Sequence, residues 1–301
     1  MKVKEELKKG AEYLLQAGVE HYQLESEILL AHTLQIPREG LYIHDELEIK
    51  HESYTRWISV LNERKKKKPI AYILGRKEFM SMDFLVDEKV LIPRPETEFI
   101  VEKVIELTTA KRNFPWRIVD LGTGSGNMTV SLLNYLTESL VFAIDISNDA
   151  LMIAKSNAKR YKVENRAIFF QGNWFSPLEG KHLEKKMDFI ISNPPYLTQA
   201  EMNSLPPDVE YEPKIALDGG NDGLKFYEGI INNSLRFLKE EGVLFLETGI
   251  RQKDRVLGLI KESKGYFDAE VIKDYSGFDR IVVAQKRSVV IPSEARNLFY
   301  G

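Results

Sequence analysis

The feature that most constrains this chain is a glycine loop directly after a short apolar strand. Residues 117–121 read as a strand and lead into Asp120-Leu121-Gly122-Thr123-Gly124-Ser125-Gly126. Glycines at alternate positions let the backbone approach a ligand closely before a helix begins near Asn127. A dinucleotide-binding loop has its third glycine one position later, in the pattern G-x-G-x-x-G. The spacing therefore disfavours an NAD enzyme.

Beyond residue 96, apolar strand candidates alternate with helical stretches. This alternation is typical of the α/β class, in which helices cover both faces of a mainly parallel sheet and ligands bind at the carboxyl ends of its strands. We predict a doubly wound, mostly parallel, seven-stranded Rossmann-like sheet whose last two strands form an antiparallel pair. The candidate strands are residues 117–121, 141–145, 167–171, 189–192, 242–247, 269–272 and 280–284.

The chain before this region has a different periodicity. Helical spacing dominates from residue 4 to about residue 67, whereas residues 70–94 alternate with period two and predict a hairpin. The expected division is a helical domain at 1–68, a hairpin linker at 69–95, an α/β domain at 96–286 and a loosely held or disordered tail at 287–301. The predicted apolar stripes are Leu7, Ala11, Leu14 and Leu15; Ile28, Leu29, Ala31 and Leu34; Tyr54, Trp57, Ile58 and Leu61; and, in the hairpin, Phe79, Met82, Phe84 and Val86.

Composition removes several classes of protein. The chain is 43% hydrophobic and 29% charged, and no apolar run reaches the roughly 20 residues of a membrane helix. Its charged start lacks the apolar stretch of a signal peptide, so we expect a cytoplasmic protein. With no cysteine there is no thiolate nucleophile or zinc–thiolate site, and the 5 histidines show no ligand spacing, so no metal site is expected. The net charge of −3 gives no general attraction to nucleic acid.

Two further strand ends bear polar or aromatic side chains that suit a nucleoside. Asp145 ends the second α/β strand, where its carboxylate could accept hydrogen bonds from both ribose hydroxyls; alternatively it caps the next helix. After the third strand, Trp174 could lie beside an adenine ring and Asn173 could bond its edge, although an isolated Trp after a strand is more often a cap of the core. With the glycine loop, this pattern favours binding of S-adenosylmethionine.

The tetrapeptide Asn193-Pro194-Pro195-Tyr196 follows the fourth strand, about 70 residues after the glycine loop. A planar amide or ring amino nitrogen is a poor nucleophile because its lone pair is delocalised. The Asn193 side-chain oxygen and the Pro194 carbonyl could each accept one N–H of such an NH2 group, and both bonds would strengthen as the nitrogen gains positive charge. Two prolines preset these acceptors, and Tyr196 could stack on the planar target. The alternative is a simple Asn-Pro turn.

These motifs resemble those of the class I S-adenosylmethionine-dependent methyltransferases, and among them the bacterial peptide chain release factor glutamine methyltransferases of the PrmC/HemK family. The resemblance covers the chain to about residue 285 and implies methylation of the side-chain nitrogen of the glutamine in the Gly-Gly-Gln motif of release factors. The product would be S-adenosylhomocysteine, and residues 1–68 would help to grip the release factor. Besides the tetrapeptide, the resemblance is based on residues 69–75, 92–98, 211–213 and 216–220. The Pro-Arg-Pro-Glu-Thr-Glu run within 92–98 is the most specific of these segments.

The resemblance also implies roles for individual residues. Asn173 departs from the pattern, since relatives often have Asp before the Trp, and residues after 287 have no family counterpart. No membrane or direct nucleic-acid contact is implied, and we expect a monomer. The implied donor-binding residues are Gly122, Thr123, Gly124, Ser125, Gly126, Asp145, Trp174 and Asn193; the implied catalytic residues are Asn193, Pro194 and Tyr196; the implied substrate-binding residues are Asn193, Pro194, Pro195 and Tyr196.

Other interpretations stay open. The same amide chemistry would serve a ribosomal-protein glutamine methyltransferase, and the tetrapeptide also suits adenine-N6 methylation of DNA or RNA, which needs an electropositive groove. A non-catalytic translation-factor binding module is a further alternative. Arg94 and Glu96 could orient the donor or substrate, or brace the domain junction. The run at residues 63–68 reads as a solvated helix end, or as a contact for an acidic partner.

Overall fold

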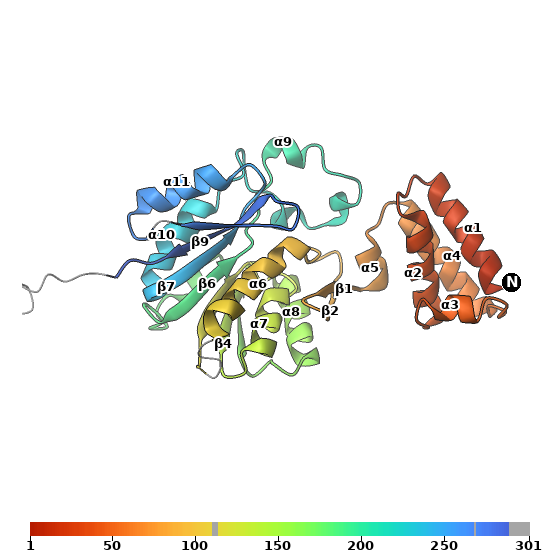
Figure 1. The fold of residues 1–301 in the computed structure, drawn as a ribbon, viewed down its shortest axis with the longest axis horizontal. Helices are drawn as coiled ribbons and strands as arrows, with labels where there is room; N and C mark the ends of the chain where they lie inside the picture. Colours follow the sequence, from red (N-terminus) through yellow and green to blue (C-terminus); the bar gives the residue numbers. More distant parts are fainter. Residues whose placement is uncertain (110–113, 268, 289–301) are drawn as a thin grey trace, which may run out of the picture.

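The computed structural model describes residues 1–109, 114–267 and 269–288. A small helical body lies beside a larger α/β body, and a short helix and a hairpin connect the two (Figure 1). The tail expected at 287–301 lies outside the described residues, apart from its first two positions.

The helical body has its own apolar core. Leu14, Leu29 and Trp57 are fully buried at its centre. The prediction for Leu15 and Ile58 was wrong, because these side chains are 52% and 37% exposed. Each follows a buried neighbour, and successive side chains on a helix point about 100° apart. The helices are α1 (Val3–Gln16), α2 (Tyr22–Leu34), α3 (Gly40–Ile43) and α4 (His51–Lys65).

The linker begins with a helix rather than with alternating residues. The period-two prediction was therefore wrong at its start, where α5 (Ile70–Leu74) forms. Pro69 precedes its first turn, and Gly75 ends it with a φ of 68°, in the left-handed region that glycine tolerates. The hairpin is confirmed as β1 (Arg76–Phe79) paired antiparallel with β2 (Met82–Leu85). Its buried side chains pack into the α/β core.

The predicted sheet class is confirmed. The seven strands lie in the order β5-β4-β3-β6-β7-β9-β8. All pairs up to β7 are parallel, whereas β9 runs antiparallel to both β7 and β8. The chain order reverses on either side of β3, so a crevice forms at the carboxyl ends of β3 and β6. The strands are β3 (Arg117–Leu121), β4 (Leu140–Asp145), β5 (Ala167–Gln171), β6 (Met187–Ser192), β7 (Leu238–Glu247), β8 (Glu270–Lys273) and β9 (Asp279–Gln285).

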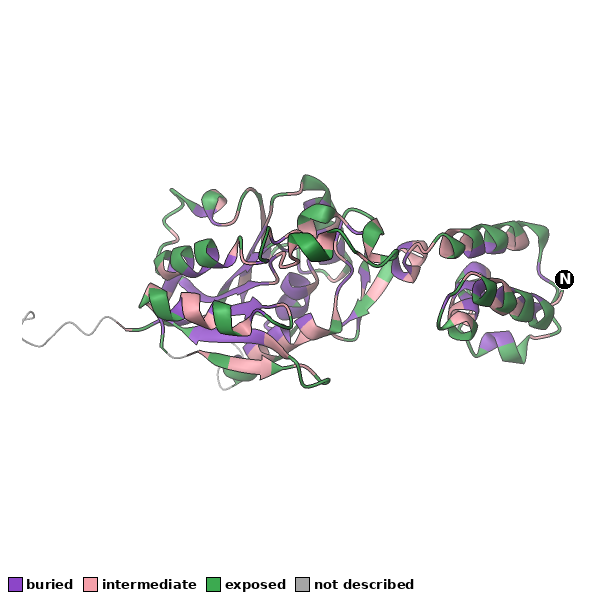
Figure 2. Ribbon diagram, turned by 90° about the horizontal axis from the view of Figure 1, so that it is seen from above, coloured by how far each residue is buried: buried purple, intermediate pink, exposed green. Residues whose placement is uncertain are grey.

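Helices cover both faces of this sheet, and Figure 2 shows the buried strands between their outer, exposed surfaces. One apolar core includes Ile100 and Leu132, and the other includes Tyr227 and Val256. The longer helices are α6 (Pro95–Thr108), α7 (Asn127–Tyr135), α8 (Asn148–Arg160), α10 (Tyr227–Phe237) and α11 (Lys253–Ser263); α9 (Gln199–Met202) and the 3-10 turns η2 (Ser176–Leu178), η3 (Val209–Tyr211) and η4 (Lys214–Ala216) lie in loops.

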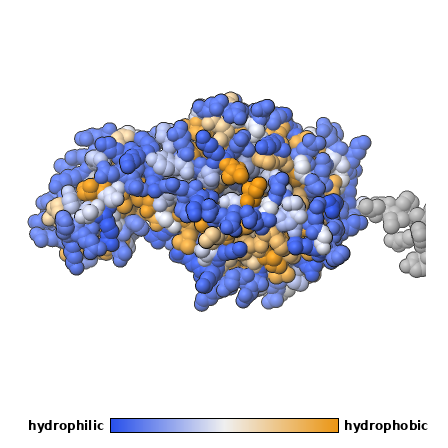
Figure 3. Space-filling view, turned by 180° about the vertical axis from the view of Figure 1, so that it is seen from behind, coloured by the Kyte–Doolittle hydropathy of each residue, from blue (hydrophilic) through white to orange (hydrophobic). Residues whose placement is uncertain are grey.

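The surface is mainly hydrophilic, with apolar side chains gathered near the middle of one face of the α/β body (Figure 3). No helix within the described part of the chain is long and apolar enough to span a membrane.

The basic run at the end of α4 is only partly solvated. The guanidinium of Arg64 pairs with Glu25 at 2.5 Å, and both side chains are largely buried. The ammonium of Lys68 pairs with Glu88 of the linker at 2.9 Å. Residues 65 and 66 are exposed, whereas Arg64, Lys67 and Lys68 are partly buried, so the prediction of a solvated face was wrong for these three. This run therefore stabilises the helical body through Arg64 and joins it to the linker through Lys68.

Candidate active site

The glycine loop joins β3 to α7 and needs glycine for two reasons. Gly122, Gly124 and Gly126 have φ values of 73°, 55° and 76°, which side chains rarely adopt. A Cβ on Gly126 would also lie 3.0 Å from the Cβ of Ala154 on α8. The helix starts at Asn127, as predicted.

The buried carboxyl of Asp120 holds this loop in place through hydrogen bonds. One oxygen of Asp120 accepts hydrogen bonds from the hydroxyls of Thr123, at 2.7 Å, and Thr129, at 2.6 Å. The other oxygen has no partner in the described part of the chain. Burial raises the pKa of Asp120 to about 6, against the lowering effect of the two hydroxyls.

Asp145 lies at the carboxyl end of β4, next to this loop. One carboxyl oxygen accepts from the Gly124 N–H and the other from the Ser147 N–H, both at 2.9 Å. Burial raises the pKa of Asp145. Ser147, rather than Asp145, is the N-cap of α8, since its hydroxyl accepts from the Ala150 N–H at 3.2 Å. Each Asp145 oxygen therefore keeps a lone pair for a ligand.

A cavity of about 370 Å³ opens above the loop. Trp174 forms part of its wall with a φ of 48°, and its ring packs on Phe226 with 5.0 Å between centroids. A left-handed φ in a bulky residue is strained and is typical of functional sites. Thr123 and Ser125 are buried beneath the loop and do not line the cavity. Of the predicted residues, the cavity brings together Gly122, Gly124, Asp145, Asn173, Trp174, Asn193 and Pro195.

A second cavity, of about 330 Å³, adjoins the first. Asn193 lines both cavities, together with Leu91 and Ala216. Tyr196 and Arg94 line only the second. Pro194 lines neither and is buried between its neighbours. The predicted tetrapeptide thus stands at the junction of two separate binding volumes.

Several contacts hold the tetrapeptide in place. Ser192, just before it, donates to the Leu121 carbonyl at 2.8 Å, and the Gln252 amide donates to the Tyr196 carbonyl at 2.7 Å. A Cβ on Gly219 would lie 2.7 Å from the Tyr196 Cα, so the Asp-Gly-Gly motif keeps this space open. Burial raises the pKa of the Tyr196 phenol, which therefore stays protonated.

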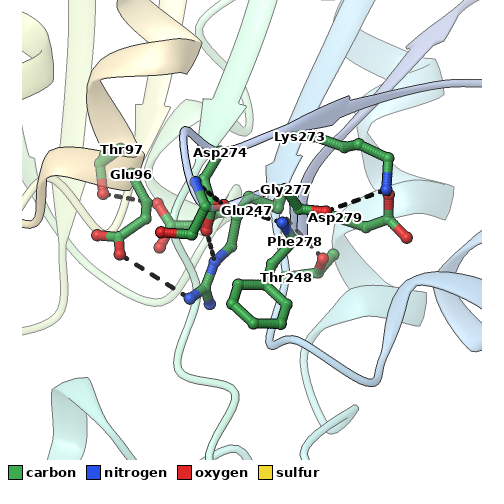
Figure 4. A network of polar contacts seen from close by, with 11 residues as sticks. Glu96, Thr97, Glu247, Thr248, Lys273, Asp274, Gly277, Phe278 and Asp279 are labelled. Carbon is green, nitrogen blue, oxygen red and sulfur yellow. Dashed lines mark hydrogen bonds and ion pairs between the residues drawn. The ribbon is translucent and has the colours of Figure 1, made fainter.

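Sequence reasoning gave no role to Thr97 and Glu247, which are linked by hydrogen bonds to Asn193. Thr97 accepts a hydrogen bond from the Asn193 side-chain amide at 3.2 Å and donates one to Glu247 at 2.6 Å. Figure 4 shows Thr97 and Glu247 side by side. The available signal was the position of Glu247 at the carboxyl end of the strand beside β6, the same kind of position that singled out Asp145.

Arg94 and Glu96 form structural ion pairs. Arg94 pairs with Glu212 at 2.5 Å, and Glu96 with Arg280 at 3.9 Å. Glu212 also accepts from the Ile92 N–H at 3.3 Å. These contacts support the bracing interpretation, while Arg94 additionally lines the second cavity.

Comparison with known proteins identifies the family. A model of the PrmC N-terminal domain matches residues 5–75, and a model of the methyltransferase small domain matches residues 98–205. The release factor glutamine methyltransferase of Moorella thermoacetica is 37% identical over 287 residues, 95% of this chain and 99% of that protein. The chain belongs to the release factor glutamine methyltransferase family. The homologue of Geobacter sulfurreducens is 38% identical over 271 residues, covering 90% of this chain and 92% of its own.

A structural comparison agrees on the fold. The hMettl16 catalytic domain, solved with an RNA hairpin of the MAT2A 3′UTR, superposes with a TM-score of 0.55. It covers 81% of this chain and 84% of its own, at 16% identity. At that identity the likeness concerns the methyltransferase fold alone. Membership of a methyltransferase family implies S-adenosylmethionine as donor.

Proposed function

We propose that this enzyme transfers a methyl group from S-adenosylmethionine to the side-chain nitrogen of the glutamine in the Gly-Gly-Gln motif of peptide chain release factors. The products are N5-methylglutamine and S-adenosylhomocysteine, and the reaction takes place in the cytoplasm. The observation that carries the proposal is the position of Asn193 where the two cavities meet. A donor in the first cavity and a glutamine side chain in the second would meet at this residue.

The first cavity fits the donor. Asp145 would accept the two ribose hydroxyls, and Trp174 would lie against the adenine, whose edge Asn173 would bond. When bound, S-adenosylmethionine supplies an electrophilic methyl group on a positively charged sulfur. Asp120 and Asp145 have no Lys or Arg ion-pair partner among the described residues, and Lys89 and Lys225 line the same cavity.

The second cavity fits a glutamine side chain. The Asn193 side-chain oxygen would accept one N–H of the target amide, and this bond strengthens as charge develops on nitrogen, whereas the Pro194 carbonyl, expected to accept the other N–H, does not line this cavity. Pro194 and Pro195 fix the backbone beforehand, so little entropy is lost on binding. Tyr196, protonated and neutral, would cover the planar amide without acting as a base.

The same proposal assigns a role to each of the three regions of the chain. Residues 1–68 would grip the release factor, residues 69–95 would link, and residues 96–286 would carry out methyl transfer in a monomer. The hydroxyl of Tyr211 donates to the Lys66 carbonyl at 2.9 Å, which couples the loop beside the second cavity to the end of α4. Substrate bound by the helical body would therefore be close to the acceptor cavity.

The test is methyl incorporation from labelled S-adenosylmethionine into a purified release factor. Its controls are the same factor with the Gly-Gly-Gln glutamine changed to Ala, a ribosomal protein fraction and unmethylated DNA. Label in the unmodified factor alone would support the proposal. Label only in ribosomal protein or DNA would overturn the acceptor while keeping the methyltransferase, and no label in any arm would overturn both.

A further inference from the structure

We propose that Thr97 and Glu247 are positioning residues that hold the Asn193 side chain with its oxygen toward the acceptor amide. The inference rests on the proposed function and names residues to which the motif analysis gave no role. Neither residue lines the acceptor cavity, so both would act through Asn193.

The three residues come from three separate elements. Thr97 lies in the first turn of α6, Asn193 follows β6, and Glu247 ends β7. Thr97 and Glu247 are only 3% and 1% exposed. Bulk water therefore does not compete for the hydrogen bond between Thr97 and Glu247, whereas the one between Asn193 and Thr97 is only partly buried.

The direction follows from counting protons. The Asn193 NH2 group donates to the Thr97 oxygen, and the single hydroxyl proton of Thr97 is donated to Glu247. When Glu247 is ionised, above its raised pKa of about 7, it can only accept, so Thr97 is left with lone pairs only and can accept only the nitrogen side of the Asn193 amide. The oxygen side must then point the other way, toward the junction of the cavities.

This orientation matters because the two ends of an Asn amide have nearly the same shape. Rotated by half a turn, Asn193 would present its NH2 group to the NH2 group of the glutamine, placing donor against donor. The hydrogen bond that strengthens during transfer would be lost. Packing alone distinguishes the two orientations poorly, whereas the hydrogen-bond chain ending at Glu247 distinguishes them chemically.

Burying the carboxyl of Glu247 at this position lowers the stability of the fold. Burial raises its pKa to about 7, against the lowering effect of the Thr97 hydroxyl. The guanidinium of Arg280 pairs with Asp274 at 2.9 Å and with Glu96 at 3.9 Å rather than with Glu247. A buried carboxyl without an ion-pair partner costs stability, and the hydrogen bond from Thr97 offsets part of that cost.

The test compares Thr97→Val, which keeps the side-chain shape but removes the hydroxyl, with Thr97→Ser, which keeps the hydroxyl. Thr108→Val is the matched control: it also removes a buried hydroxyl from α6, but that hydroxyl bonds only to carbonyls of its own helix. For each variant we would measure kcat and KM with the release factor, S-adenosylhomocysteine affinity by calorimetry, and Tm.

In Thr97→Val we expect kcat to fall roughly tenfold to a hundredfold, as for a misplaced catalytic group, with S-adenosylhomocysteine affinity unchanged. Thr97→Ser should keep kcat within about threefold of the original, and Thr108→Val should lose only stability. Equal kcat in the Val and Ser variants, or a kcat loss in Thr97→Val matched by lost S-adenosylhomocysteine affinity, would overturn the inference. The unmodified enzyme in the same assay tests the proposed function separately.

A second variant tests the same hydrogen-bond chain independently, in case Thr97→Val does not fold. Glu247→Gln can turn either end of its amide toward Thr97, so it no longer imposes a direction, and we expect a smaller kcat loss than in Thr97→Val. In the double variant the Gln substitution should add almost no further loss, because the hydroxyl it acts through is absent. Losses that multiply independently would overturn the chain from Glu247 to Asn193.

Discussion

The donor and acceptor halves of the site lie side by side but are built differently. The donor half uses the ends of β3, β4 and β5, which position the glycine loop, Asp145 and Trp174, while Asn193 after β6 is shared with the acceptor half. The acceptor half adds side chains from α6, from β7 and from the loop before α11 to one tetrapeptide. The pair formed by Thr97 and Glu247 alone spans 150 residues of sequence.

This difference shows which parts of a site can be predicted from local sequence patterns. A strand, a loop and a helix within one βα unit have fixed geometry, so a motif read locally places its residues correctly. The acceptor half depends on which strand lies next to β6, which is a property of the sheet as a whole. Substitutions should therefore separate the two halves: donor residues should change affinity, and acceptor residues should change turnover.

The largest effect is expected for Asn193→Ala. Loss of an acceptor that is strongest in the transition state should lower kcat by about 10² to 10³, with S-adenosylhomocysteine affinity little changed. Steady-state kinetics with a release factor and calorimetry with S-adenosylhomocysteine measure the two quantities. The control is Asn233→Ala, on the exposed side of α10. Loss of S-adenosylhomocysteine affinity equal to the loss of kcat would contradict the division into halves.

Asp145→Ala should show the opposite pattern. It removes the acceptor for two hydroxyls and two hydrogen bonds that hold the loop, so S-adenosylhomocysteine should bind roughly tenfold to a hundredfold more weakly. At saturating S-adenosylmethionine much of the kcat should return. Asp254→Ala, whose carboxyl is 88% exposed, serves as control. Unchanged affinity would remove Asp145 from the donor half.

Gly219→Ala should disturb the acceptor half through a steric clash with Tyr196. The new Cβ would press on the backbone of Tyr196, which we expect to lower kcat about fivefold to tenfold and to destabilise the fold by about 1 to 3 kcal/mol. Gly229→Ala, inside α10 with no atom within 4 Å of the added carbon, should instead stabilise by about 0.5 to 1 kcal/mol. Urea denaturation distinguishes them, and similar stability in both would disprove the steric argument.

The last prediction concerns the dependence of stability on pH rather than catalysis. Glu247 has its pKa raised from 4.5 to about 7 in the folded chain. Between these values the unfolded chain has lost the proton and the folded chain retains it, so the free energy of unfolding falls as pH rises through this window. Glu247→Gln should reduce that fall, by on the order of 3 kcal/mol at most. Urea denaturation from pH 4.5 to 8 measures it; identical slopes in the two proteins would refute the shifted pKa.

Much of the fold was predictable from short-range pattern. The strands at 117–121 and 167–171 coincide with β3 and β5, and the late antiparallel pair is present. The errors have local causes: a proline and a glycine made a helix of residues 70–74, and Leu15 and Ile58 lie beside the residues that fill the core. A pattern identifies an apolar stripe more reliably than its edges.

The site was predictable to a more limited extent. Gly122, Gly124, Asp145, Trp174 and three of the four tetrapeptide residues line adjoining cavities, whereas Thr123, Ser125, Gly126 and Pro194 do not; the roles of all of them in binding and transfer stay predictions. The basic run at 63–68 illustrates the limit, because Arg64 and Lys68 have acidic partners 39 and 20 residues away in sequence, in another helix and in the linker. Charge composition alone does not say which charges face water.

The sequence by itself determined the class of sheet, the glycine loop and the tetrapeptide, because each depends on residues within one strand–loop–helix unit whose geometry is local. Only the tertiary structure decided that Asn193 stands between two cavities, that Gly219 backs Tyr196, and that Glu247 reaches Asn193 through Thr97. Those contacts join elements far apart in sequence. They depend on the order of strands in the sheet, and so on the free energy of the whole packed core.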